Sequence, residues 1–368
     1  MFLLDDEKKL AISQCLLHGI PFAAYLNPGD TYCCFLASDP TRHVNGSAIK
    51  PDEINGFNGF LFNRFELSDT LHAYGIPQEL SAFEAIALAD TLPKLNAPVW
   101  PPFESTDYDS YRHQVESITK AIGSESEKVV LSHIVCIQSE LDPATVADKY
   151  FSLHPSCFRY IYYTPESGIW IGASPELLLA VNRISGDVRS MSLAGTRKAG
   201  ENTPWDRKNT LEHNIVTDFI VKTLSPFCES ISEPKQTSVI FGDIEHLCHI
   251  IQAKASQLDL SALIPRLCPT PALCGYPREK AMTLITQNEQ FQRNCYGGFV
   301  GISAPERASF YVNLRCASTQ TRAETRKQVY TLYGGGGLTC HSTPESEWIE
   351  AKSKMNSLIK VLSNQSSR

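Results

Sequence analysis

The sequence lacks the features that mark several large classes of protein. Its 368 residues contain no apolar run long enough to span a membrane, and Asp5, Asp6 and Glu7 stand where a secretory signal would carry positive charge. There are 33 Lys and Arg against 40 Asp and Glu, so the net charge is −7, and no basic run is present to follow a phosphate backbone. We therefore expect a cytoplasmic protein that binds neither membranes nor nucleic acid.

Disulfide frameworks and nucleotide-binding motifs are also missing. The 12 Cys are dispersed, with one adjacent pair (Cys33 and Cys34) and no Cys-x-x-Cys, so we expect reduced thiols that act as small core residues. No glycine-rich phosphate turn joins a strand to a helix, which excludes the Rossmann and P-loop patterns. His246 and His249 have no Cys or His partner at a finger-like spacing, so a zinc site is not expected.

The chain does contain a long series of strand-like segments. These dominate from residue 128 onward, and the Pro-rich, polar stretch 92–109 is the expected linker before them. Such a pattern predicts a mostly antiparallel sheet core with helices outside it. The expected helices are 6–18, 80–94, 111–122, 206–224, 277–290 and 344–362, and the expected strands are 22–26, 31–36, 128–135, 158–163, 169–173, 177–181, 237–241, 299–302, 309–314 and 329–333.

Two charged residues lie in apolar surroundings that would suit acid–base chemistry. Lys128 opens the segment Lys-Val-Val-Leu-Ser, where partial burial would favour the neutral amine, which can act as a base. Glu176 lies in Ala-Ser-Pro-Glu-Leu-Leu-Leu, where burial would raise the pKa of its carboxyl toward general-acid use. Each pattern also fits a structural residue, either a strand-end lysine that reaches water or an acid that begins an element.

Acidic residues and a glycine run could bind ligands. Glu347 and Glu350 are three residues apart, which places them on one helical face, and Glu212 lies on an earlier expected helix. Carboxylates are typical ligands of Mg²⁺, although most Glu pairs at this spacing simply face solvent. The four glycines 334–337 follow an expected strand, and their backbone could approach an anion closely or form a flexible turn.

Taken together and in order, these segments resemble the chorismate-binding enzymes. That family includes isochorismate, salicylate, anthranilate and aminodeoxychorismate synthases, and the likeness covers roughly residues 105–362. The number and order of the motifs make the resemblance specific. The matching segments are 128–132, 173–178, 193–197, 212–216, 269–277, 296–301, 313–317, 335–338 and 347–350.

The resemblance implies an α/β fold in which two large, mostly antiparallel β-sheets pack face to face, with helices around them and the active site in a cleft. Residues 105–368 would form the catalytic region. Residues 1–104 would be a variable part interwoven with the same fold. We expect a monomer or a weak homo-oligomer that has no glutaminase subunit.

The resemblance also implies a role for each matching residue. Lys128 would be the base that deprotonates water for attack at C2 of chorismate, and Glu176 the acid that protonates the leaving hydroxyl at C4. Glu212 and Glu350 would hold Mg²⁺, with Glu347 supporting the metal through water. The implied substrate-binding residues are Arg315, Lys354 and the backbone of Gly335, Gly336 and Gly337 for the carboxylates, Thr196 and Tyr296 for the pocket walls, and His246 beside the ring.

Lys128 favours water as the nucleophile. Relatives that transfer ammonia usually carry Gln at this position, and Ala194 stands where the aminodeoxychorismate branch often has a nucleophilic Lys. The resemblance therefore implies an isochorismate synthase, most like those of menaquinone formation, with siderophore synthesis, salicylate synthase and a non-catalytic scaffold as the alternatives. Five positions depart from the common family pattern: His133, Asn209, His249, Cys268 and Gly336.

Overall fold

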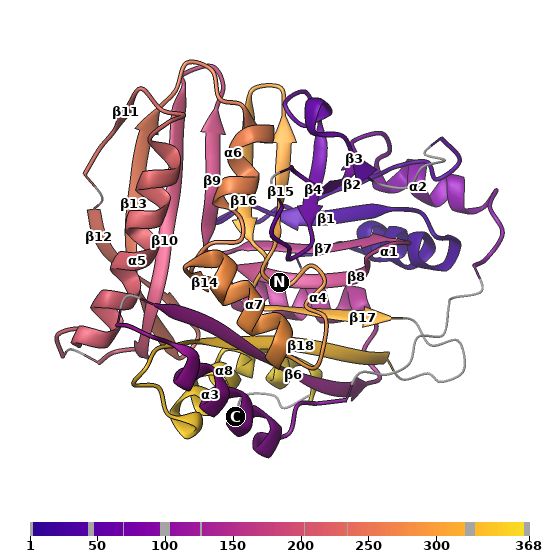
Figure 1. Ribbon diagram of the computed structural model, residues 1–368. Coiled ribbons are helices and arrows are strands. Elements are labelled where there is room, and N and C mark those ends of the chain that lie inside the picture. Colours follow the sequence, from indigo (N-terminus) through magenta and orange to yellow (C-terminus); the bar gives the residue numbers. More distant parts are fainter. Residues whose placement is uncertain are drawn as a thin grey trace.

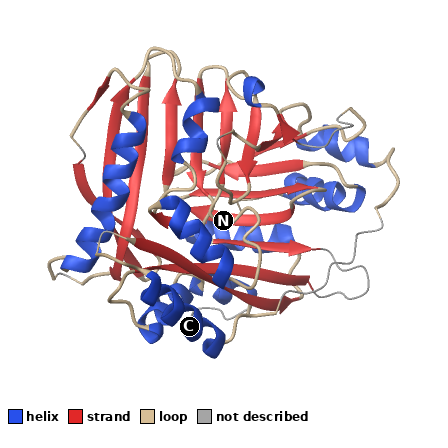
Figure 2. Cartoon of the chain, in the orientation of Figure 1, coloured by secondary structure: helices blue, strands red, loops and turns tan. Residues whose placement is uncertain are grey.

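Two large antiparallel β-sheets form the body of the molecule, and helices cover them (Figure 1, Figure 2). The predicted α/β class is confirmed. Every strand pairing between named strands is antiparallel, which agrees with the absence of βαβ phosphate-binding units from the sequence. The structure, a computed structural model, describes residues 3–42, 48–68, 70–95, 104–125, 127–201, 203–233, 235–320 and 328–363.

The first sheet has eight strands in the order β14-β6-β18-β17-β8-β7-β1-β2. Its long strands β6 and β18 pair from Val129 opposite Leu338 to Ser139 opposite Gln328. The strands of this sheet are β1 (Phe22–Leu26), β2 (Cys34–Ala37), β6 (Lys128–Ser139), β7 (Phe158–Thr164), β8 (Gly168–Ser174), β14 (Gly275–Tyr276), β17 (Cys316–Gln320) and β18 (Gln328–Leu338).

The second sheet follows the order β11-β13-β10-β9-β16-β15-β4-β5-β3, and β12 also pairs with β13. The pairing of β10 with β13 is interrupted by a bulge between Ala194 and Thr196. The strands of this sheet are β3 (Ala48–Ile49), β4 (Gly59–Asn63), β5 (Ala73–Pro77), β9 (Leu177–Asn182), β10 (Asp187–Lys198), β11 (Ser230–Ile231), β12 (Lys235–Phe241), β13 (Ile244–Lys254), β15 (Phe299–Ala304) and β16 (Arg307–Val312).

The main hydrophobic core lies between the two sheets. Tyr160 and Trp170 of the first sheet belong to the same buried cluster as Phe60 and Phe310 of the second. The rings of Phe60 and Tyr162 lie 5.2 Å apart between centroids, a distance typical of packed aromatic pairs. The strands of the two sheets cross at a large angle in Figure 1. The predicted face-to-face packing is confirmed.

The helices cover the sheets and close the ends of the strands. α5 packs on β10 and β13, α4 on β7 and β8, and α8 on β18. Polar residues begin several helices: Asp206 accepts a hydrogen bond from the amide of Asn209 and so caps α5. The helices are α1 (Asp6–His18), α2 (Ala82–Ala89), α3 (Tyr108–Ala121), α4 (Pro143–Leu153), α5 (Arg207–Leu224), α6 (Leu260–Leu267), α7 (Arg278–Asn288), α8 (Pro344–Ser353) and α9 (Asn356–Leu362), with a 3-10 turn at Pro51–Glu53.

Two expectations about the C-terminal part of the chain are wrong. Residues 344–362 form two helices rather than one, because α8 ends at its C-cap Lys354 and α9 starts again at Asn356. The glycines 334–337 do not form a turn after a strand. They lie inside β18, opposite residues 130–133 of β6, since a strand ladder is built from backbone groups and needs no side chain.

The N-terminal hundred residues supply strands to both sheets. β1 pairs with β7, and β4 pairs with β15. The buried carboxylate of Asp148 on α4 accepts hydrogen bonds from the amides of Leu3 and Leu4, which holds the start of the chain against α4. The division at residue 104 stays a prediction, and residues 96–103 of the expected linker lie outside the described residues.

All twelve cysteines are free thiols, as the sequence predicted. Eight of them are buried as small core residues, and Cys340 is exposed. In the part of the chain that the structure describes, no helix has both the length and the apolar character needed to cross a bilayer.

Candidate active site

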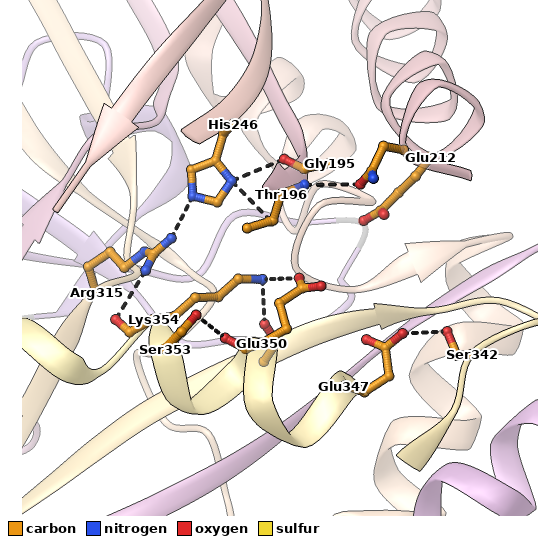
Figure 3. Close-up of polar contacts among 12 residues, drawn as sticks. Gly195, Thr196, Glu212, His246, Arg315, Ser342, Glu347, Glu350, Ser353 and Lys354 are labelled. Carbon is orange, nitrogen blue, oxygen red and sulfur yellow. Dashed lines mark hydrogen bonds and ion pairs between the residues drawn. The ribbon is translucent and has the colours of Figure 1, made fainter. Parts of the chain in front are cut away.

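A cavity lies between the two sheets, on the side where α5 and α8 approach β18 (Figure 3). Strands of both sheets contribute to its wall, together with the loops that precede β9, β15 and β17. The fold therefore gathers residues that are spread along the chain from Lys128 to Lys354. The expected site residues that line the cavity are Lys128, Glu176, Thr196, Glu212, His246, Tyr296, Arg315, Gly335, Gly337 and Lys354.

Lys128 and Glu212 form an ion pair at one end of the cavity. The Nζ atom of Lys128 lies 2.7 Å from Oε1 of Glu212, and the two side chains are 1% and 12% exposed. Lys128 is the first residue of β6, and Glu212 lies on the second turn of α5. A buried ammonium needs such a partner, because an isolated charge in the interior would be strongly unfavourable.

The glycine run of β18 gives this ion pair its space. A Cβ atom on Gly337 would lie 2.5 Å from Oε1 of Glu212 and 2.6 Å from Cε of Lys128, which is closer than such atoms can approach. On the opposite face of β18, a Cβ atom on Gly336 would lie 2.7 Å from Oε2 of Glu347. Gly335 and Gly337 therefore face the cavity, whereas Gly336 faces α8.

Glu176 is a deeply buried acid in the cavity wall. It follows Pro175 in the corner between β8 and β9, and only 1% of it is exposed. Burial raises the pKa of its carboxyl to about 8, although Lys128, Arg315 and Lys354 act in the opposite direction. Within the described residues its Oε1 atom has no hydrogen-bond partner. The direction of this shift agrees with the expectation from the apolar sequence around Glu176, and its role as an acid stays a prediction.

His246 of β13 holds the guanidinium of Arg315. Nη2 of Arg315 donates to Nε2 of His246 over 2.7 Å, and Nδ1 of His246 lies 3.1 Å from the carbonyl oxygen of Gly195. Because a guanidinium only donates and a carbonyl only accepts, the ring carries its proton on Nδ1. Burial lowers the pKa of His246 well below its usual range, and Arg315 and Lys354 add to this effect, so the ring is neutral.

Arg315 lies in the connection between β16 and β17 with a left-handed backbone, φ 52°. This conformation costs a non-glycine residue on the order of 1 kcal/mol, and the surrounding contacts hold it in place. Nη1 donates to the carbonyl oxygen of Lys354, and the guanidinium lies over the ring of Phe241 at 4.6 Å. Burial lowers the pKa of Arg315 to about 10, which leaves it charged at neutral pH.

Thr196 is positioned by Asn209, a residue that the sequence reasoning did not assign to the site. The amide of Thr196 donates to Oδ1 of Asn209 over 3.0 Å, and its hydroxyl lies 3.2 Å from Nδ1 of His246. Gly195 takes the left-handed backbone, φ 77°, that makes the bulge before Thr196. Asn209 comes three residues before Glu212, on the same face of α5, and this spacing was the available signal.

Lys354 and Glu350 form a second ion pair, at the end of α8. Nζ of Lys354 lies 2.9 Å from Oε1 of Glu350 and donates to the carbonyl oxygen of Gly335 over 2.8 Å. Figure 3 shows Glu350 directed into the space between α8 and Glu212. Glu347 instead points toward Ser342, whose hydroxyl donates to Oε1 over 2.6 Å, and it lies across β18 from Glu212.

Tyr296 forms part of the wall between the two sheets. It is buried, its ring stacks on Tyr333 with 5.2 Å between centroids, and burial raises the pKa of its hydroxyl to about 12. The hydroxyl therefore stays protonated. Apolar lining residues that sequence reasoning did not single out are Val130, Leu193, Ala272, Leu273 and Leu314.

Comparisons with known proteins identify the family to which the chain belongs. The family model described as "Chorismate binding enzyme" matches residues 67–363. Isochorismate synthase EntC of Escherichia coli K12 is 28% identical over 274 residues, which cover 70% of this chain and 67% of EntC. Isochorismate synthase MenF of Pasteurella multocida is 29% identical over 264 residues, covering 67% of this chain and 59% of MenF. The structure of the menaquinone-specific isochorismate synthase MenF of E. coli superposes with a TM-score of 0.75 at 20% identity, over 98% of this chain and 91% of that one.

The close approach at Gly337 generates a test of the site geometry. In Gly337→Ala the new methyl group would have to displace Glu212 and Lys128, so we expect catalytic efficiency on the enzyme's substrate to fall by about tenfold or more. The matched control is Gly336→Ala, whose methyl group meets only the far end of Glu347. Equal losses in the two variants, measured by steady-state kinetics beside thermal unfolding, would contradict this account.

Proposed function

The chain belongs to the chorismate-binding enzyme family, and from this premise we propose that it is an isochorismate synthase, an isomerase that converts chorismate reversibly to isochorismate. The observation that carries the proposal is the pairing of two buried groups in one cavity. Lys128 is a buried lysine that, in its neutral amine form, can accept a proton, and Glu176 is a buried carboxyl that holds one at neutral pH. An exchange of hydroxyl groups between two ring carbons needs one group of each kind.

The two residues divide the reaction between them. Lys128, in its neutral amine form, removes a proton from a water molecule, whose oxygen bonds to C2 of the ring. The ring double bond shifts, the C4–O bond breaks, and Glu176 donates its proton to the departing hydroxyl, which leaves as water. One water enters and one leaves, so the product is an isomer of the substrate, and in the reverse direction the roles of the two residues are exchanged.

The other lining residues bind and orient the dianionic substrate. Arg315 is held by His246 and by the carbonyl oxygen of Lys354, so its remaining donors are fixed in direction. The ammonium of Lys354 donates a hydrogen bond to the carbonyl oxygen of Gly335 in the cavity wall. We propose that these two cations receive the carboxylates of chorismate. The apolar surfaces of Val130, Leu273 and Leu314 exclude competing water from the ring.

We propose that Glu212 and Glu350 hold one Mg²⁺ ion. Both are partly exposed carboxylates beside the cavity, and each already has a lysine ammonium at hydrogen-bond distance, so a positive charge suits both positions. No three His, Cys, Asp or Glu side chains gather as a complete metal site in the described residues, and Mg²⁺ commonly completes its shell with water and substrate. When bound, the ion would supply charge that neutralises a substrate carboxylate. A water-mediated role for Glu347 stays a prediction.

We further propose that the product serves menaquinone formation. The basis is that the amino-acid sequences of segments 311–316 and 335–339 resemble those of isochorismate synthases from menaquinone-making bacteria. Water is the proposed nucleophile because residue 128 is a lysine and not a glutamine. Salicylate synthase activity and a siderophore pathway are the alternatives. The experiment below separates the first of these, and rescue of a menaquinone auxotroph by the wild-type gene would separate the second.

Product analysis tests the proposed function directly. Purified protein is incubated with chorismate, with and without Mg²⁺, and the products are identified by chromatography and NMR. We expect metal-dependent isochorismate without pyruvate, and no conversion by Lys128→Ala, since the base acts in the transition state. Salicylate with pyruvate would move the protein to the bifunctional branch. Binding of chorismate without any conversion would reject the enzyme assignment.

The raised pKa of Glu176 predicts a pH dependence of the reaction. The acid acts in its protonated form, so the catalytic efficiency in the forward direction should fall as the pH rises through about 8. In Glu176→Gln the rate should be low, and this limb of the profile should vanish. A profile that stays flat from pH 7 to well above 8 in wild-type protein would contradict the assignment.

The same group should make stability depend on pH. The unfolded carboxyl ionises near 4.5, whereas the folded one holds its proton until about 8, so the unfolding free energy falls as the pH rises through this interval. Chemical denaturation of the wild-type protein, compared with Glu176→Gln over that range, measures this contribution without relying on activity.

Glu350→Gln tests the proposed metal site. Replacing the carboxylate by a neutral amide removes a charged oxygen ligand, so we expect the concentration of Mg²⁺ needed for half-maximal activity to rise by roughly tenfold or more. Calorimetric titration with Mg²⁺ in the presence of chorismate gives a second readout. The control is Glu345→Gln in the first turn of α8. Unaltered metal titration curves in the Glu350 variant would reject its role.

A further inference from the structure

The strand that carries Lys128 has an incomplete neighbour on one side. β18 pairs with β6 along its length, but on the other edge β14 pairs only with Lys128 and Val129. Beyond that point, no strand among the described residues lies against this edge at residues 130–132. Backbone groups on a buried edge require partners, because an unpaired buried N–H or C=O costs about 1–3 kcal/mol.

Two side chains from the segment that follows α7 satisfy this edge. Oε1 of Glu289 accepts the amide hydrogen of Ser132 over 2.8 Å, and Nη2 of Arg293 donates to the carbonyl oxygen of Val130 over 2.6 Å. The amide of Val130 donates to the carbonyl oxygen of Cys274. The side chains of Glu289 and Arg293 thus supply the hydrogen bonds that the backbone of a neighbouring strand would otherwise provide.

The two side chains are also an ion pair buried in the protein. Nε of Arg293 donates to Oε2 of Glu289 over 2.8 Å, Nη2 lies 2.5 Å from Oε1, and both side chains are 3% exposed. Burial lowers the pKa of Arg293, but Glu289 more than offsets this and the pKa is raised overall. The guanidinium stays charged, and its geometry is fixed by two parallel contacts with the carboxylate.

Arg293 connects three parts of the cavity wall. Besides Val130 on β6, its Nη1 atom donates to the carbonyl oxygen of Leu273 over 2.7 Å, and its own carbonyl oxygen accepts the amide hydrogen of Tyr296 over 2.9 Å. Val130, Leu273 and Tyr296 all line the cavity, whereas neither Glu289 nor Arg293 does. The ion pair therefore lies behind the wall, on the side away from the substrate.

We propose that Glu289 and Arg293 are positioning residues for the reaction, which hold β6, and with it Lys128, in register with the loops that carry Leu273 and Tyr296. The inference rests on the proposed function for its kinetic consequence. Lys128 is two residues from Val130 on the same strand face, so a shift of β6 at the Val130 rung moves the base relative to the ring. A displacement of about 1 Å can lower a rate on the order of a hundredfold.

Arg293→Lys is the sharpest test, because it preserves the positive charge but removes the branched guanidinium with its several N–H donors. A single ammonium can pair with Glu289 but cannot also reach the carbonyl oxygens of Val130 and Leu273. We expect the turnover rate on chorismate to fall by roughly tenfold to a hundredfold, while the affinity for chorismate changes by less than about threefold. Glu289→Gln, which leaves the guanidinium unpaired, should show the same split between turnover and affinity.

The matched control is an exposed ion pair that joins the same two elements. Lys280 on α7 lies 2.6 Å from Glu127, the residue before β6, and the two side chains are 41% and 21% exposed. Lys280→Met should leave turnover unchanged, since exposed pairs contribute little. Hydrogen–deuterium exchange adds a readout that does not depend on activity: amides in residues 128–136 should exchange faster in Arg293→Lys than in wild-type protein or the control.

The outcomes separate the positioning role from the proposed function. Turnover by Arg293→Lys and Glu289→Gln within about twofold of wild type, with lowered melting temperatures, would make the pair a structural feature only. Wild-type protein that converts no chorismate would overturn the proposed function instead. In that case the exchange rates decide, and unchanged exchange of residues 128–136 in Arg293→Lys rejects the positioning role as well.

Discussion

The ion pair between Lys128 and Glu212 constrains more of the molecule than any other contact of the site. It places a nearly inaccessible ammonium against a carboxylate from another element, so α5 must approach the start of β6 closely. β18 passes directly beside the pair, and it can do so only because Gly337 has no side chain. The bulge at Gly195 lets β10 bend around the same end of α5, where Asn209 accepts the amide hydrogen of Thr196. The absence of a side chain at Gly337 is thus a consequence of the buried pair.

A continuous chain of hydrogen bonds crosses the floor of the cavity from α5 to α8 (Figure 3). It runs from Asn209 through Thr196, His246 and Arg315 to the backbone of Lys354. Arg315 contributes the only charged side chain to this series of hydrogen bonds, because burial keeps His246 neutral and Lys354 takes part through its backbone carbonyl. A neutral imidazole can orient the guanidinium of Arg315 through its lone pair without cancelling the charge that a dianionic substrate would meet.

Sequence reasoning found many elements with regular apolar spacing, but it missed others, among them α4, α6, β4 and β5. It also missed elements in which the site interrupts the pattern. The predicted segments 158–163 and 206–224 agree closely with β7 and α5. β10 was missed because Ser190, Ser192 and the bulge at Gly195 break its alternation, although all serve a packed interior. The glycine run was placed after the strand 329–333 because glycine weakens a strand pattern, whereas it lies inside β18 and the contacts across that strand explain it. Family motifs identified ten of the cavity-lining residues, but Glu289 and Arg293 act through backbone groups of β6, which no sequence pattern displays.

The protonation of Glu176 follows from how the cations around it are engaged. Lys128, Arg315 and Lys354 all lower the pKa of this carboxyl, yet burial outweighs them. The reason lies in their hydrogen bonds: Lys128 is directed to Glu212, Arg315 to His246 and a backbone carbonyl, and Lys354 to Glu350 and Gly335. Each cation is held by another acceptor, so it acts on Glu176 only through space, and a proton remains where the departing hydroxyl would need it. The residues packed around Glu176 therefore keep its carboxyl protonated by burying it, and the partners of the three cations keep those cations from forming an ion pair with it.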